Sequence, residues 1–86
     1  MNDSLEQQVK NIVIELFLAG DSAFPMQDDT DLIMEGICDS LGLVRLAATL
    51  EERFPGVRIQ DQDVTHENLG SPRAIVEQLK RAGVSG

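Results

Sequence analysis

Three side chains in this sequence are of the types that enzymes use as nucleophile or base: Cys38, Ser40 and His66. A nucleophilic enzyme needs a nucleophile, a base within reach of it and a group that orients the base. His66 is the single histidine, and it falls in a short polar stretch, THENL, that is typical of an exposed turn. Because no third member of a triad is indicated, we expect the chain not to be an enzyme.

Two acid-rich stretches, DDTDLIMEG and DQDVTHEN, could in principle bind calcium. A loop of the EF-hand type needs oxygen ligands at positions 1, 3 and 5, glycine at 6 and glutamate at 12. Counted from Asp29, Ile33 and Met34 occupy positions 5 and 6; counted from Asp61, Pro72 occupies position 12. One cysteine and one histidine also cannot form a zinc site within the chain. We expect no metal site.

Ser40 remains as a residue on which another enzyme acts. Asp39 or Ser40 is expected to be the N-cap of a helix, because both residue types are preferred there. The free N–H groups and the positive dipole at such a helix end also stabilise a phosphate attached to a serine. Asp39 can share a magnesium ion with an incoming pyrophosphate. Gly42 is expected to leave the approach to the serine open.

The apolar residues predict helices that position this serine. Eighty-six residues can bury one small core, so residues 1–86 are expected to form a single domain. The first helix is predicted over residues 4–18, with Ser4 and Gln7, or Asp3 and Glu6, as its capping box and Gly20 at its end. Its apolar face comprises Leu5, Val9, Ile12, Val13, Leu16 and Phe17.

Three further helical segments follow a long loop over residues 20–39, in which Met26 and Met34 are expected to anchor the chain. The second helix runs from Asp39 or Ser40 to Phe54 and is stopped by Pro55 and Gly56. After an extended segment at Val57–Ile59 and a turn at Asp61 and Asp63, Thr65 caps a short helix, HENL. The last helix begins at Pro72 after Ser71 and ends at Gly83, with a buried stripe of Ala74, Ile75, Gln78, Leu79 and Ala82.

The charge pattern restricts the partners. The net charge is −8, and residues 21–67 hold eleven of the fifteen acidic residues but three of the seven basic ones. Nucleic acid is therefore excluded as a partner, because phosphate binding requires clustered lysine and arginine. Basic protein surfaces are favoured instead. No apolar run has the length of a signal peptide or a membrane span, so we expect a cytoplasmic protein.

Asp39, Ser40 and Leu41 form a DSL motif at the start of the second helix, and the surrounding pattern from about residue 5 to 82 resembles a known family. The family is that of the acyl and peptidyl carrier proteins, in particular those that stand alone. The resemblance implies an all-α fold: a small four-helix bundle of three main helices and one short helix, with a long first loop. It also implies that Ser40 carries 4′-phosphopantetheine from coenzyme A, flanked by Asp39 and Leu41, and that cargo is held on this arm as a thioester.

The same resemblance implies the partners of a non-catalytic carrier. They are a phosphopantetheinyl transferase, a ligase or acyltransferase that loads the carrier, and downstream synthase or tailoring enzymes, all acting on a monomer. The docking residues that it implies are Leu41, Val44, Arg45, Glu51 and Glu52. Arg45 stands where fatty-acid carriers usually have an acid, and Gly36 lies one residue further from Asp39 than is usual there.

These two departures favour an acyl or aminoacyl carrier of polyketide, nonribosomal peptide or other specialised biosynthesis. The alternative is an acidic helical adaptor for a basic protein, in which Ser40 is only a helix cap. In that alternative the serine has no covalent chemistry.

Overall fold

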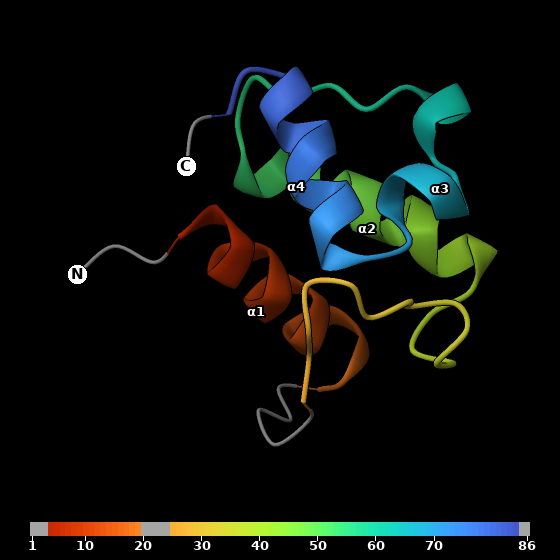
Figure 1. Ribbon diagram of the computed structural model, residues 1–86. Coiled ribbons are helices and arrows are strands. Elements are labelled where there is room, and N and C mark those ends of the chain that lie inside the picture. Colours follow the sequence, from red (N-terminus) through yellow and green to blue (C-terminus); the bar gives the residue numbers. More distant parts are fainter. Residues whose placement is uncertain (1–3, 20–24, 85–86) are drawn as a thin grey trace.

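The computed structural model describes residues 4–19 and 25–84, and within these ranges every regular element is helical. Helix α1 spans Leu5–Phe17, α2 spans Ser40–Arg53, α3 spans His66–Leu69 and α4 spans Pro72–Arg81 (Figure 1). A short 3₁₀ helix at Asp61–Asp63 occupies the place where the sequence predicted a turn. The predicted all-α fold, a small bundle of three main helices and one short one, is thus confirmed.

Each α-helix begins where a side-chain oxygen accepts a hydrogen bond from the backbone N–H three residues later. Ser4, Asp39, Thr65 and Ser71 are these N-caps, with N···O distances of 3.1, 2.8, 3.1 and 3.2 Å. Such caps satisfy N–H groups that have no partner within the helix, and each contributes about 1 kcal/mol to stability. The four helix starts are therefore fixed by local sequence.

The ends of α1 and α4 show how the chain leaves a helix. Gly83 has a positive φ of 99°, and its N–H donates to the Lys80 carbonyl at 3.0 Å, as the prediction of a glycine stop requires. The residue predicted to end α1, Gly20, lies outside the described residues. The left-handed residue there is Ala19, with φ 52°, directly after the C-cap Leu18.

One apolar core joins the helices. Helix α4 packs against α1 and α3, and α2 contacts both α1 and α3. The predicted stripe of α4 is partly wrong, because Val76 is buried whereas Ala82 is exposed. Ala82 is the C-cap and leaves the helical face, and contacts on two sides widen the buried stripe of α4 to include Val76. The most completely buried side chains are Leu5, Val9, Val13, Leu32, Leu46, Leu50, Leu69, Pro72, Ile75 and Leu79.

The segment 25–39, which crosses the lower part of Figure 1 towards the start of α2, is anchored at several points. Leu32 is fully buried; its N–H donates to the Gly70 carbonyl at 2.7 Å, and its own carbonyl accepts from Ile37 and Cys38 at 2.9 and 3.0 Å. Met26 is buried, as predicted, but Met34 is 78% exposed, so its predicted anchoring role is wrong. The backbone hydrogen bonds of Leu32 provide the anchor that a second methionine was expected to supply.

A further anchor ties the same segment to α1 and α4. The Lys10 Nζ lies 2.8 Å from the Asp28 Oδ1, and the Asp28 carbonyl accepts from the Arg73 N–H at 2.8 Å. The hydrogen bond from Lys10, together with its charge, lowers the pKa of the Asp28 carboxyl below its usual value. In the described ranges, no helix has the combination of length and apolar composition that crossing a bilayer requires.

Candidate functional site

Ser40 is the first residue of α2, and its side chain is exposed. The N-cap is Asp39, whose Oδ1 accepts the Gly42 N–H at 2.8 Å. Within residues 4–19 and 25–84, the Ser40 hydroxyl has no hydrogen-bond partner. The adaptor alternative, in which Ser40 serves as the cap, is therefore wrong on this point. Asp39 caps the helix, and the neighbouring hydroxyl is left accessible.

Gly42 serves close packing, a role that the sequence did not indicate. It is buried, and a Cβ atom at this position would lie 2.8 Å from the Cys38 Cβ and 3.1 Å from the Phe17 Cε1. Both distances are shorter than ordinary van der Waals contact. The absence of a side chain at Gly42 thus lets the end of α1 and the preceding loop approach the first turn of α2.

A tight turn leads from the loop to the site. The Asp31 Oδ1 accepts from the Ile33 and Met34 N–H groups at 3.1 and 3.0 Å, and the Asp31 carbonyl accepts from Glu35 at 2.9 Å. Gly36 closes the turn with a φ of 73°, a conformation that favours glycine. The position of Gly36 therefore reflects the geometry of this turn.

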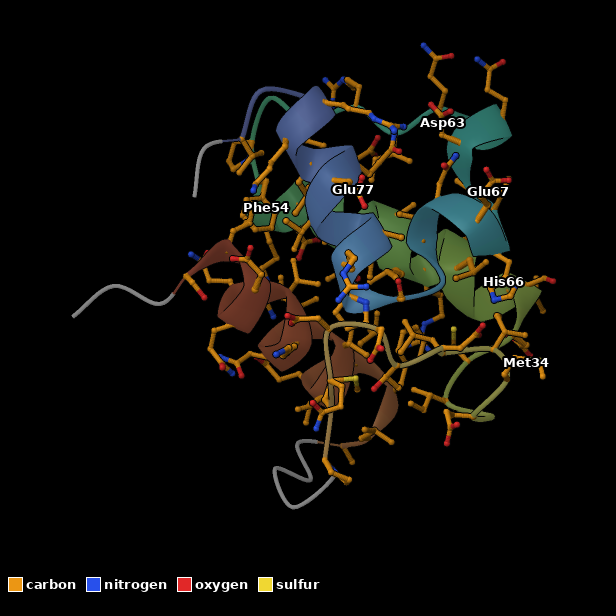
Figure 2. The ribbon with its side chains drawn as sticks, in the orientation of Figure 1. Met34, Phe54, Asp63, His66, Glu67 and Glu77 are labelled. Carbon is orange, nitrogen blue, oxygen red and sulfur yellow. The ribbon has the colours of Figure 1, made fainter. Side chains whose placement is uncertain are left out.

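His66 holds the same turn from α3. Its Nε2 lies 2.8 Å from Asp31 Oδ1 and 2.9 Å from Asp31 Oδ2, and Figure 2 shows Met34 and His66 on the same side of the molecule. The pKa of the Asp31 carboxyl is lowered, first by the hydrogen bond from the Met34 N–H and then by that from His66. The histidine thus has a structural partner that the sequence did not reveal.

Cys38 is half-buried and borders a pocket of about 430 Å³. Burial raises the pKa of its thiol, and the carboxylates of Asp39 and Asp31 raise it further. A raised pKa leaves less thiolate, so this cysteine is a weak nucleophile near neutral pH.

The predicted docking residues of α2 differ in exposure. Leu41 and Val44 are 76% and 56% exposed, far more than apolar residues that serve the core, and Arg45 and Glu52 are exposed as well. Glu51 is half-buried, and its Oε2 accepts the Ile59 N–H at 2.8 Å. Four of the five side chains are thus available on the surface. Glu51, the less exposed one, also holds the extended segment after α2 through this hydrogen bond.

The geometry around Ser40 fits a covalent phosphate. The hydroxyl is exposed, it is unbonded among the described residues, and it stands at the N-terminus of a helix of 14 residues. No three histidine, cysteine or acidic side chains gather as metal ligands in the described part of the chain. A serine at such a place can receive a phosphodiester and does not require a base of its own.

Comparison with known proteins identifies the family. Residues 7–79 match the family model described as "Phosphopantetheine attachment site". The protein belongs to this family of carriers, whose members bear 4′-phosphopantetheine covalently on a serine. Two relatives match over 77 residues, which is 90% of this chain.

Both relatives are named "D-alanyl carrier protein". One, from Abiotrophia defectiva, is 32% identical, and the match covers 94% of its length. The other, from Enterococcus faecalis (strain ATCC 700802 / V583), is 27% identical, and the match covers 95% of its length. The family resemblance inferred from the DSL motif and its context is thus confirmed.

Proposed function

We propose that Ser40 is the attachment serine and that the chain is a discrete, non-catalytic carrier of an aminoacyl or acyl group. The observation that carries this proposal is the exposed Ser40 hydroxyl at the first position of α2, beside an aspartate that supplies the cap. Family membership supports it, because members carry the arm on a serine. The chain is then substrate and carrier of other enzymes, and residues 1–86 act as one monomeric domain.

The attachment step uses few groups of this chain. The Ser40 oxygen attacks the phosphorus of the coenzyme A pyrophosphate that bears pantetheine; a new O–P bond forms, the pyrophosphate bond breaks, and 3′,5′-ADP leaves with the electron pair. The serine proton passes to a base of the transferase. Asp39 holds the first turn of α2 through Oδ1, and its carboxylate would also help to hold a magnesium ion, which would neutralise the charge of the pyrophosphate. The helix N-terminus stabilises the phosphodiester.

We propose D-alanine as the first cargo to test, because both relatives are named for it. The chain would be loaded by an adenylating ligase and would pass the aminoacyl group to a downstream enzyme in the cytoplasm. The polyketide or nonribosomal peptide cargo expected from the sequence remains a second prediction, in which an acyltransferase or ligase loads an acyl group. A panel of cargoes distinguishes the two.

The test is the intact mass of the purified protein after incubation with coenzyme A and a broad-range phosphopantetheinyl transferase. Wild type and the control Ser4→Ala are expected to gain the mass of one arm, whereas Ser40→Ala gains none. Loading is then measured with D-alanine, L-alanine and malonyl donors and their ligases or transferases. Wild type that stays unmodified with several transferases would overturn the proposal and favour the adaptor.

A further inference from the structure

The pocket of about 430 Å³ beside Ser40 has no part in the function proposed above. It is lined by Phe17 at the end of α1, by residues 36–39 before α2, and by Leu41, Gly42 and Arg45 in the first turns of α2. Its size lies in the range of small-molecule sites. Because its lining includes both chain neighbours of Ser40, a group attached to the serine starts at its edge.

The lining combines an apolar part with two opposite charges. Phe17, Ile37 and Cys38 are half-buried and supply apolar surface, while Asp39 and Arg45 supply one carboxylate and one guanidinium. Arg45 is exposed and makes no ion pair with any side chain in residues 4–19 and 25–84. The lining has no net formal charge, so it suits a chain of uncharged polar groups, and Arg45 remains available to pair with an anion.

A second pocket on α2 is acidic. This groove, of about 320 Å³, is lined by Val44, Ala47, Ala48, Ile59 and Val64, together with the acids Glu51 and Asp61 and no basic residue. An anionic phosphodiester would be repelled by these two carboxylates. The electrostatics therefore favour the Arg45 pocket for a group that begins with a phosphate.

We propose that the pocket between Phe17, Cys38 and Arg45 seats the 4′-phosphopantetheine arm of Ser40 when no partner enzyme is bound. The inference rests on the function proposed above. The ligand is an anionic phosphodiester followed by a geminal dimethyl group and two amides. The dimethyl group packs on Phe17 and Ile37, and Arg45 pairs with the phosphodiester or donates to an amide carbonyl.

Because the arm is attached to Ser40, weak contacts with the pocket are sufficient to hold it there. A ligand tethered next to its pocket acts at a millimolar effective concentration, so a low intrinsic affinity can keep it bound for much of the time. Arg45 thereby gains a role in holding the arm, distinct from the docking role implied by the family resemblance. Partner enzymes draw the arm out by offering stronger contacts to the same groups.

Cys38 provides the readout, because it is the single cysteine and borders the pocket. We compare apo protein with protein that carries an arm whose terminal thiol is replaced by hydrogen, transferred from the corresponding coenzyme A analogue. The rate of Cys38 alkylation by iodoacetamide, followed by mass, is expected to fall several-fold in the arm-bearing form. Each variant is compared with its own apo form, which cancels the effect of the substitution itself on thiol reactivity.

Arg45→Ala is expected to remove most of this protection, whereas Arg58→Ala, at an exposed arginine outside the pocket, retains it. Amide resonances that shift on arm attachment should belong to Gly36, Ile37, Leu41 and Gly42. Equal alkylation rates with and without the arm would overturn the proposal that the arm occupies this pocket. Amide shifts at Ala48, Ile59 and Val64, which line the acidic groove, with none at the four residues above would also overturn it. If no arm can be attached, the proposed function itself fails, and the mass shows this separately.

Discussion

At the scale of single residues, Asp39 and Ser40 have separate tasks. One carboxylate oxygen of Asp39 accepts a hydrogen bond from the Gly42 N–H, and this bond fixes the start of α2. Ser40 makes no such contact among the described residues, although serine is itself a good capping residue. Under the proposed function, stability and modification therefore belong to different side chains, and mutation can separate the two.

Asp39→Ala is expected to lower the free energy of unfolding by about 1 kcal/mol, because the Gly42 N–H loses its acceptor. Ser40→Ala should change it by less than about 0.5 kcal/mol, as is usual for exposed residues without a specific contact. Urea unfolding at neutral pH measures both, and Asp39→Asn, which keeps an acceptor oxygen, is the control. A larger loss for Ser40→Ala than for Asp39→Ala would contradict the assignment of the cap.

The sequence predicted most of this residue-scale picture, because caps act over three residues. Thr65 and Ser71 were assigned from local pattern alone, and Ser4 was one of two candidates; all three accept a hydrogen bond from the N–H three residues later. The pairing of His66 with Asp31 spans 35 residues and depends on how α3 packs against the loop, so no local pattern indicates it. The packing role of Gly42 was missed for the same reason.

At the scale of elements, the segment 25–39 behaves as part of the bundle. Leu32 anchors it in the core, Lys10 and Arg73 hold Asp28, and His66 holds Asp31. The sequence predicted a long loop with buried apolar residues but assigned Met34 to the interior. Leu32, Ile33 and Met34 are consecutive apolar residues, so residue type does not show which of them enters the core; the backbone hydrogen bonds of Leu32 accompany its burial.

The anchors of this segment predict sensitivity to acid. The pKa values of Asp28 and Asp31 are lowered in the folded protein, by hydrogen bonds from Lys10 and from the Met34 N–H respectively. Between the unfolded aspartate pKa of about 4 and the lower pKa values of the folded protein, the unfolded chain binds more protons than the folded one. Stability should therefore fall as the pH falls through this window. Urea midpoints at neutral pH and at successively lower pH measure the slope.

Asp31→Asn should reduce this acid slope, since the amide cannot be protonated but still offers an acceptor for the loop. It should also lower stability at neutral pH, where the carboxylate is charged. Asp29→Asn, at an exposed position in the same segment, is the control and should leave the slope unchanged. An acid slope that survives intact in Asp31→Asn would show that this carboxyl does not couple folding to pH.

At the scale of the whole molecule, charge dominates. A net charge of −8 on 86 residues acts against compaction through self-repulsion, and it also attracts basic partners from a distance. The described structure contains two ion pairs of lysine or arginine with acids, Lys10 with Asp28 and Arg53 with Glu15. Most acids are therefore not compensated by a neighbouring cation. The net charge could be predicted from composition, whereas which charged residues form ion pairs depends on the fold.

Added sodium chloride is expected to stabilise the protein. Screening on the scale of about 10 Å at 0.1 M weakens repulsion among exposed carboxylates, so the urea midpoint should rise between about 0.01 and 0.2 M salt. The double variant Asp29→Asn, Glu35→Gln removes two exposed acids and should show a smaller rise. A midpoint that falls with salt would mean that ion pairs outweigh repulsion.

The bonds of Leu32 have a consequence for every enzyme that meets this protein. Its N–H is tied to the corner between α3 and α4, and its carbonyl holds the two residues that lead to Asp39. The start of α2 is therefore tied through the loop to the α3–α4 corner, so Ser40 keeps a set position relative to the rest of the bundle. Travel of the cargo between enzymes then depends on the length of the arm and on tumbling of the whole body.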